Sequence, residues 1–310
     1  MVKRRRVGAS DVSAFGASVE LFSQLDATRG GGYARAALVS FLHGTLTPLL
    51  DGVFSERVGR SLFAAAAEAT LLGAWMSYDA GRHGLAQRYF VQAVGLAEDS
   101  GSRALSGTVL SAMSHQATYL GHARDAANLA RAALLGASAT MSMTQQAQVY
   151  AMEARALAGL GEARGCDQAL TNATSALERE DADMPAWISY FDQRELYAEI
   201  GHCIRDLGRT AAAARYAERS VDGGCGPRSD FFAEMVAADA YRAEGEYELA
   251  TTTALRALRL GEQLDSRRCL AYVNDFRRNL PTDDASAVVR EFIEQVEDYP
   301  LWQQTDESVP

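Results

Sequence analysis

Five glycines recur through the middle of the chain at intervals of 40, 40, 47 and 37 residues: Gly81, Gly121, Gly161, Gly208 and Gly245. Each one separates two stretches whose apolar residues are spaced three and four positions apart, which is typical of α-helices. Repeat periods of about 34 to 47 residues are typical of stacked helix pairs. The glycines therefore predict an all-α, tetratricopeptide-like solenoid of antiparallel helix pairs without a β-sheet.

Mostly small residues occupy fixed positions around each glycine. They stand five, nine and twelve positions after it in the second helix, and seven positions before it in the first helix. The second-helix sets are Ala86/Phe90/Ala93, Ala126/Ala130/Ala133, Cys166/Leu170/Ala173, Ala213/Ala217/Ser220 and Ala250/Ala254/Ala257. The first-helix residues are Ala74, Ser114, Ala154, Gly201 and Ala238. Steps of four and three put each set on one helical face, so we expect these faces to pack together within each pair.

The same patterns divide the chain into five parts. Residues 1–10 form a basic N-terminal arm, and residues 11–54 hold helices predicted at 12–25 and 33–50. Residues 55–262 contain the five repeats. Residues 263–299 are predicted to form capping helices, at 266–280 and 284–296, and residues 300–310 a disordered tail.

Composition restricts the partners. A formal net charge of −10 disfavours nucleic-acid binding over most of the surface. The basic cluster Lys3-Arg4-Arg5-Arg6 is either a solvated tail or an arm that contacts phosphates. No apolar stretch of signal-peptide or membrane-spanning kind is present, and the four cysteines are scattered. We therefore expect a cytoplasmic protein with reduced thiols and no membrane contact.

Catalytic signatures are missing from the sequence. It contains no H-E-x-x-H, C-x-x-C, G-x-S-x-G or G-x-x-x-x-G-K-[ST] motif. We therefore predict that the chain is not an enzyme and binds neither a metal nor a cofactor.

The first helices carry the candidate binding residues, six and three positions before each glycine. They are Trp75, Tyr78, His115, Arg155, His202, Arg205, Asp239 and Arg242. First helices line the concave surface of a solenoid, so these side chains are predicted to face one continuous groove. The row thirteen positions before each glycine shares this face: Glu68, Thr108, Gln148, Glu195 and Phe232. An ordinary solvated helix face is the alternative.

The groove would bind an unknown small molecule, peptide or protein. Aromatic and Arg residues in a concavity are typical of recognition sites. The Arg side chains would suit a carboxylate or phosphate on the partner. The two histidines would make binding sensitive to pH near neutrality.

Several stretches resemble a known family. They are RRRVGASDV at residues 4–12, GGGYAR at 30–35, GAWMSYDAG at 73–81, HGLAQRYF at 83–90, MSHQA at 113–117, YFD at 190–192, HCIRDLG at 202–208 and DFRR at 275–278. Together they make the chain similar to the C-terminal tetratricopeptide-like sensor region of actinobacterial helix-turn-helix transcriptional regulators. The resemblance implies a regulator of differentiation or secondary metabolism, and regulators of this type commonly act as dimers.

The family's DNA-binding domain precedes the Arg-rich start, where this chain begins, so the chain is either a stand-alone sensor half or a part of a longer protein. Direct sequence-specific DNA binding is not expected without a recognition helix. Two other readings remain open: a regulator that binds DNA through the Arg-rich arm, and an accessory protein or atypical enzyme of a biosynthetic pathway.

Overall fold

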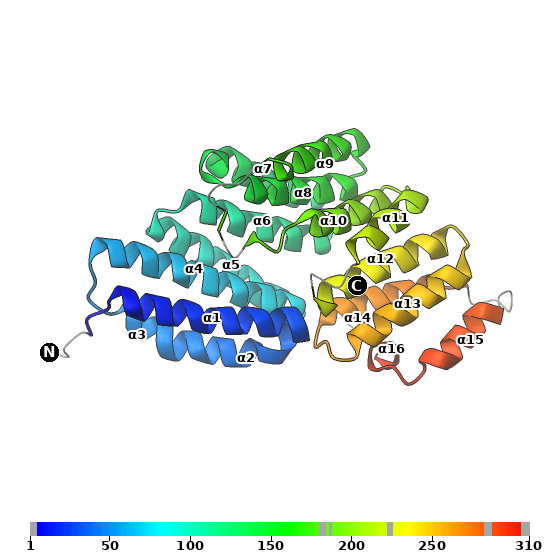
Figure 1. The fold of residues 1–310 in the computed structure, drawn as a ribbon, viewed down its shortest axis with the longest axis horizontal. Coiled ribbons are helices and arrows are strands. Elements are labelled where there is room, and N and C mark those ends of the chain that lie inside the picture. Colours follow the sequence, from blue (N-terminus) through cyan, green and yellow to red (C-terminus); the bar gives the residue numbers. More distant parts are fainter. Residues whose placement is uncertain (1–4, 180–183, 186–187, 222–225, 282–286, 305–310) are drawn as a thin grey trace.

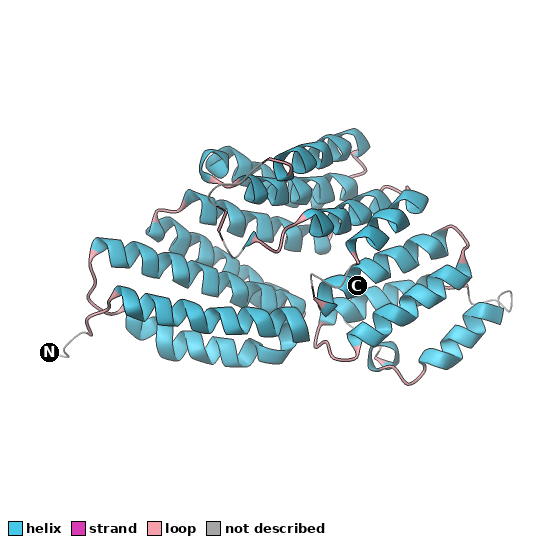
Figure 2. Ribbon diagram, in the orientation of Figure 1, coloured by secondary structure: helices cyan, strands magenta, loops and turns pink. Residues whose placement is uncertain are grey.

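The computed structural model describes residues 5–179, 184–185, 188–221, 226–281 and 287–304. Helices dominate these ranges (Figure 2), and the one β-type contact within them is an isolated bridge between Arg6 and Val53. None of the described helices is both long and apolar enough to cross a membrane. The predicted all-α class is therefore confirmed.

Five antiparallel helix pairs form the body of the molecule. They are α4 (Glu56–Asp79) with α5 (His83–Ser100), α6 (Arg103–Tyr119) with α7 (Ala123–Ala137), α8 (Met143–Gly159) with α9 (Ala163–Leu177), α10 (Gln193–Asp206) with α11 (Thr210–Ser220), and α12 (Pro227–Ala243) with α13 (Tyr247–Gly261). A short 3-10 helix, η2 (Ser138–Thr140), precedes α8. Each predicted glycine lies in the turn within a pair.

The turns explain why glycine recurs. All five repeat glycines have φ between 72° and 80°, where a side chain would be strained. At the first turn, Gly81 donates its N–H to the carbonyl of Tyr78, and Arg82 donates to the carbonyl of Ser77. These bonds satisfy carbonyl groups that the end of α4 would otherwise leave unpaired.

The small residues lie where the paired helices meet. All fifteen second-helix positions and all five first-helix positions are buried. Ser114 donates its hydroxyl to the carbonyl of Ala126 across one pair, at 2.8 Å. In another pair a Cβ on Gly201 would lie 3.3 Å from the backbone nitrogen of Ala217. Close backbone approach therefore requires the small residues.

The N-terminal region is more ordered than predicted. It comprises α1 (Ala9–Arg29), α2 (Gly31–Phe41), a π-helical turn η1 (Leu42–Leu46) and α3 (Thr47–Leu50). The prediction of a basic arm over residues 1–10 is wrong from Arg5 onward. Arg6 bridges to Val53, Val7 is buried, and Arg5 pairs with Asp11. Residues 1–4, with Lys3 and Arg4, lie outside the described ranges.

The C-terminal region holds α14 (Arg267–Asn279), α15 (Ala287–Val296) and α16 (Pro300–Gln303). The predicted start of the last capping helix at residue 284 lies outside the described residues. The disordered tail predicted from residue 300 is wrong for residues 300–304. The Trp302 ring lies 5.4 Å from that of Phe292, and Arg277 donates to the Trp302 carbonyl at 3.0 Å. Burial of this large apolar side chain holds the segment in place.

The solenoid bends until its two ends meet. In Figure 1 the helices follow an arc from α1 and α2, over α6 to α9, to α12 and α14. Asp265 donates its N–H to the carbonyl of Arg29 at 2.7 Å, and Gly32 donates to the carbonyl of Asp265 at 2.9 Å. An ion pair of 2.9 Å joins Arg228 to Asp26. We call this junction the seam; because of it, the concave face bounds a cavity where the sequence predicted a groove.

Candidate ligand-binding cavity

A cavity of about 370 Å³ lies on the concave side of the solenoid. Its lining comes from α1, from the first helix of every pair, from the segment before α10 and from α14. Among the described residues, none from the second helices α5, α7, α9, α11 or α13 lines it. The volume falls within the range of roughly 300 to 1,000 Å³ found for small-molecule pockets.

Four of the eight predicted site residues line the cavity: Trp75, His115, Arg155 and His202. All four stand six positions before a repeat glycine. The row thirteen positions before the glycines lines it completely, with Glu68, Thr108, Gln148, Glu195 and Phe232. The cavity therefore follows two rows of the first helices that lie about two turns apart.

The other four predicted residues do not line the cavity. Arg205 pairs with Asp206 at 2.7 Å, and Arg242 pairs with Asp239 at 2.8 Å and donates to the carbonyl of Asn279. Tyr78 is fully buried behind the lining. The prediction that all eight face one continuous concavity is therefore wrong for Tyr78, Arg205, Asp239 and Arg242.

Helix α14 explains this outcome, because its side chains fill the end of the groove where the first helices terminate. The Arg268 guanidinium lies 4.7 Å from the ring centre of Tyr78 and 4.5 Å from that of Phe232. The Tyr272 ring lies 5.9 Å from the ring of His202 and 6.0 Å from the guanidinium of Arg205. This helix was predicted as a C-terminal capping helix, whereas its side chains pack against the first helices of the repeats.

An aromatic cluster forms the wall on α4 and α6. The Trp75 ring lies 5.2 Å from that of His115, and the Tyr78 hydroxyl is 3.2 Å from His115 Nδ1. Burial, together with nearby arginines, holds the pKa of His115 and His202 well below the usual value of 6.5. Both rings are therefore neutral near pH 7, which contradicts the expected pH sensitivity through histidine.

Every arginine that lines the cavity has a carboxylate partner. Arg155 bonds to Glu199 at 2.8 Å in a pair that is about nine-tenths buried. Arg228 lies 2.9 Å from Asp26 and 3.7 Å from Asp79, and Arg268 lies 3.8 Å from Asp79. Burial raises the pKa of Asp26, and the Arg228 charge opposes that rise. Each of these arginine charges therefore has a carboxylate counter-charge within the chain, although Arg155 Nε and Arg268 Nε have no hydrogen-bond partner among the described residues.

Two carboxyl groups in the lining stand apart. Glu68 and Glu195 make no direct side-chain hydrogen bond or ion pair with any of the described residues. Burial raises the pKa of Glu68 to about 7. Burial, with a smaller effect from the nearby charge of Glu199, raises the pKa of Glu195 to about 8. At neutral pH Glu195 is therefore largely protonated and Glu68 is protonated in about half of the molecules, unless a positive charge lies beside them.

Further polar atoms in the lining are buried and have no hydrogen-bond partner among the described residues. They are Asp26 Oδ1, Ser111 Oγ, Gln148 Oε1, Arg155 Nε, His202 Nδ1 and Arg268 Nε. An unpaired buried polar atom costs about 1 to 3 kcal/mol, so folded proteins keep few of them. Their concentration around one cavity indicates a site for a polar molecule.

Five charged residues of the lining lie outside the rows predicted from sequence: Asp26, Asp79, Glu199, Arg228 and Arg268. Glu199 stands nine positions before Gly208, between the two rows that line the cavity, so a wider stripe on the helix would have included it. The other four come together only where the two ends of the solenoid meet at the seam. No pattern within a single repeat predicts that contact.

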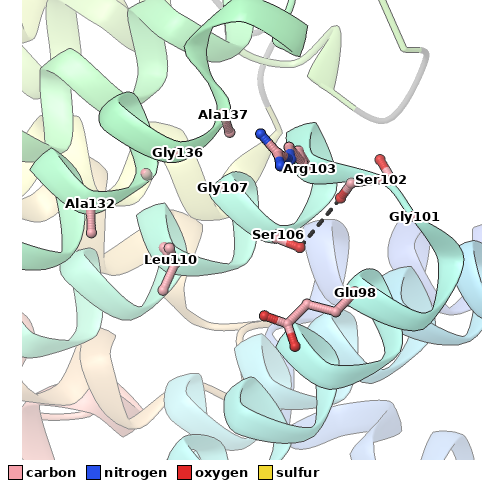
Figure 3. A pocket seen from close by; sticks show the side chains of 11 residues that line it. Glu98, Gly101, Ser102, Arg103, Ser106, Gly107, Leu110, Ala132, Gly136 and Ala137 are labelled. Carbon is pink, nitrogen blue, oxygen red and sulfur yellow. Dashed lines mark hydrogen bonds between the residues drawn. The ribbon is translucent and has the colours of Figure 1, made fainter.

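The described residues contain no group of three or more His, Cys, Asp or Glu side chains placed to hold a metal ion. A second, more open pocket lies between α5, α6 and α7, and Glu98 and Arg103 line it (Figure 3). None of its lining side chains carries an unpaired buried polar atom, so the central cavity is the stronger candidate.

Comparisons with known proteins include a distant structural similarity. No protein-family model matches the chain, and no curated protein matches it. Among solved structures it is similar to BtubC (BKLC) from P. vanneervenii, with 15% sequence identity over 91% of this chain and 97% of that chain and a TM-score of 0.44. Similarity at this level carries no information about the function of this chain.

Proposed function

We propose that this protein is a non-enzymatic repeat scaffold that binds a small molecule in its central cavity. The observation that carries the proposal is the cavity's lining, in which several buried polar atoms lack partners while the solenoid closes around them. An open groove would suit an extended peptide or a protein surface. Closure at the seam favours a ligand small enough to be enclosed.

We further propose that binding serves transcriptional regulation, with the chain acting as the sensor half of a regulator of differentiation or secondary metabolism. The resemblance of the stretches at residues 73–90 and 202–208 to the sensor regions of actinobacterial regulators supports this part. In such a protein the ligand would favour one conformation of the closed solenoid over another. A ligand shifts such an equilibrium only when its affinities for the two conformations differ.

The cavity can be tested by filling it without changing charge. Ala198 lines the cavity from α10, whereas Ala211 is exposed on α11 and serves as the control. Native mass spectrometry of protein purified under mild conditions should reveal a bound small molecule in wild type and Ala211→Leu. Ala198→Leu should lose that mass and keep its helical circular dichroism. Equal retention by both variants would contradict the proposal.

One observation favours the alternative, an accessory protein or atypical enzyme. Glu195 is a buried acid with a pKa of about 8 inside a cavity, and catalytic sites often contain such groups. The two functions differ in the fate of the ligand. Prolonged incubation of the released molecule with fresh protein should return it unchanged, and conversion to a product would favour the enzyme.

A further inference from the structure

The charges that line the cavity do not balance. Five carboxyl groups and three guanidinium groups contribute to the lining. Each guanidinium lies within 4 Å of a carboxylate, in the pairs Arg155–Glu199, Arg228–Asp26 and Arg268–Asp79. Glu68 and Glu195 remain without a direct partner among the described residues. Among the described residues, the lining therefore has two carboxyl groups without a basic partner, and every guanidinium group in it has an acidic partner.

The histidines do not supply the missing positive charge. His115 and His202 are buried, and desolvation with repulsion from Arg155 and Arg268 keeps their rings neutral near pH 7 by lowering the pKa of each. None of the described residues therefore offers Glu68 or Glu195 a positive charge within ion-pair distance, and a cationic ligand would supply one.

The surroundings of Glu68 describe the rest of the ligand. On α4, Leu71 and Leu72 follow Glu68 by one turn and Trp75 by two turns, and all of them line the cavity. The Trp75 ring also lies 6.0 Å from Phe90 and 5.2 Å from His115, which fix its orientation. This strip offers a carboxyl at one end and an apolar, aromatic surface beside it.

A second, independent observation points the same way. Gln148 is nine-tenths buried and donates its amide to the Tyr190 hydroxyl, which leaves Oε1 as an unpaired acceptor in the lining. Asp26 Oδ1 is another buried acceptor without a partner among the described residues. An ammonium group has three N–H donors and no acceptor, so it can satisfy acceptors of this kind.

We infer that the cavity recognises a small organic cation, a protonated amine on an apolar body, through the carboxylates of Glu68 and Glu195. This inference rests on the proposed function, in that the cavity must be a ligand site. The ammonium group pairs with a carboxylate, which relieves the cost of burying that charge. The apolar body lies against Leu71, Leu72 and Trp75, where a cation can also contact the indole face.

Matched probes test the charge of the ligand. The first set is 2-phenylethylamine, 2-phenylethanol and 3-phenylpropionate, and the second is hexylamine, hexanol and hexanoate. Dissociation constants are measured at pH 8 by ligand-observed NMR titration. Wild type is compared with the double variant Glu68→Gln/Glu195→Gln and with Glu98→Gln, a control at an exposed carboxyl in the second pocket (Figure 3).

We expect each amine to bind wild type and Glu98→Gln at least about tenfold more tightly than its alcohol or carboxylate, a difference of about 1.4 kcal/mol. The double variant should bind amine and alcohol equally. Carboxylates that bind as tightly as amines, or an amine preference that survives in the double variant, would overturn the inference.

The same experiment separates this inference from the proposed function. Binding of all three members of a set with equal affinity, abolished by Ala198→Leu, would leave the cavity as the ligand site and reject the cation. Failure of every probe to bind would count against the cavity itself. Thermal melts of each variant establish that it is folded before its affinity is compared.

Discussion

At the seam, Asp26 and Asp79 are buried and lie within ion-pair distance of Arg228. On the cavity wall, Glu68 and Glu195 are partly buried but have no direct partner among the described residues. These four carboxyl groups are all at least partly buried. Only the two at the seam have an arginine within ion-pair distance among the described residues. A paired buried carboxylate holds parts of the chain together, because either partner alone would be costly. An unpaired one is partly or largely protonated at neutral pH, and a cation beside it would favour the charged form.

The largest effect should come from breaking the pairing at the seam. Asp79 is almost fully buried, accepts hydrogen bonds from the Gly31 amide and the Ser266 hydroxyl, and lies near Arg228 and Arg268. Asp79→Ala leaves buried positive charge uncompensated and should lower the free energy of unfolding by about 3 to 5 kcal/mol. Urea unfolding followed by circular dichroism measures this loss.

A matched control exists within the repeats. Asp206 occupies the same repeat position as Asp79, two residues before the turn glycine, yet it is exposed and pairs only with the neighbouring Arg205 among the described residues. Asp206→Ala should cost about 0 to 1 kcal/mol. Small-angle scattering adds a second readout, because an opened seam increases the radius of gyration. Equal losses for the two aspartates would show that the seam does not close the ring.

The second effect has the opposite sign and concerns the cavity wall. The pKa of Glu68 is about 7 in the folded chain and 4.5 for a free glutamate side chain, so the folded state keeps a proton that the unfolded state releases between these pH values. Stability should therefore fall as pH rises from about 4.5 to 7, by up to about 3 kcal/mol. Glu195 acts in the same direction up to a pH of about 8.

Replacing Glu68 by Gln removes its share of that pH dependence. Glu68→Gln should be more stable than wild type at pH 8 and similar to it at pH 4.5, because Gln resembles the protonated acid. The free energy of unfolding at the two pH values, compared with Glu98→Gln, provides the measurement. A variant whose stability falls with pH as steeply as that of wild type would mean that Glu68 is paired after all.

Asp79 and Asp206 also show which contacts can be predicted from the sequence and which cannot. The glycine spacing and the small residues at Ala74 or Ala130 predicted the helix pairs, because they report contacts within one repeat. Asp79 and Asp206 share a repeat position but not an environment. The contact that distinguishes them joins Asp79 to Ser266, 187 residues away. Closure of the ring depends on the summed curvature of all the repeats, which no single repeat encodes.

Half of the predicted site residues lie outside the cavity lining for the same reason. The row of Trp75 and His115 lines the cavity, whereas the row of Arg205 and Arg242 lies where α14 fills the groove. Both rows belong to the concave face of the first helices. Only the position of Arg268 and Tyr272 on a helix outside the repeats decides which row meets the cavity.

The smallest effect on stability is expected at an ion pair that is only partly buried and lies outside the cavity. Arg242 and Asp239 form an ion pair one turn apart on α12, with side chains 20% and 29% exposed. Water screens such a pair, so Arg242→Ala should lower the free energy of unfolding by only about 0 to 1 kcal/mol. Because Arg242 lies outside the cavity lining, the affinity for the amine probes should change by less than about twofold, within 0.4 kcal/mol.

Trp75→Ala, measured in the same titration, should weaken binding about tenfold or more, because it removes an aromatic wall of the cavity. If Arg242→Ala weakened binding as much as Trp75→Ala, the ligand would extend into the region that α14 occupies, and α14 would have to move when the ligand binds.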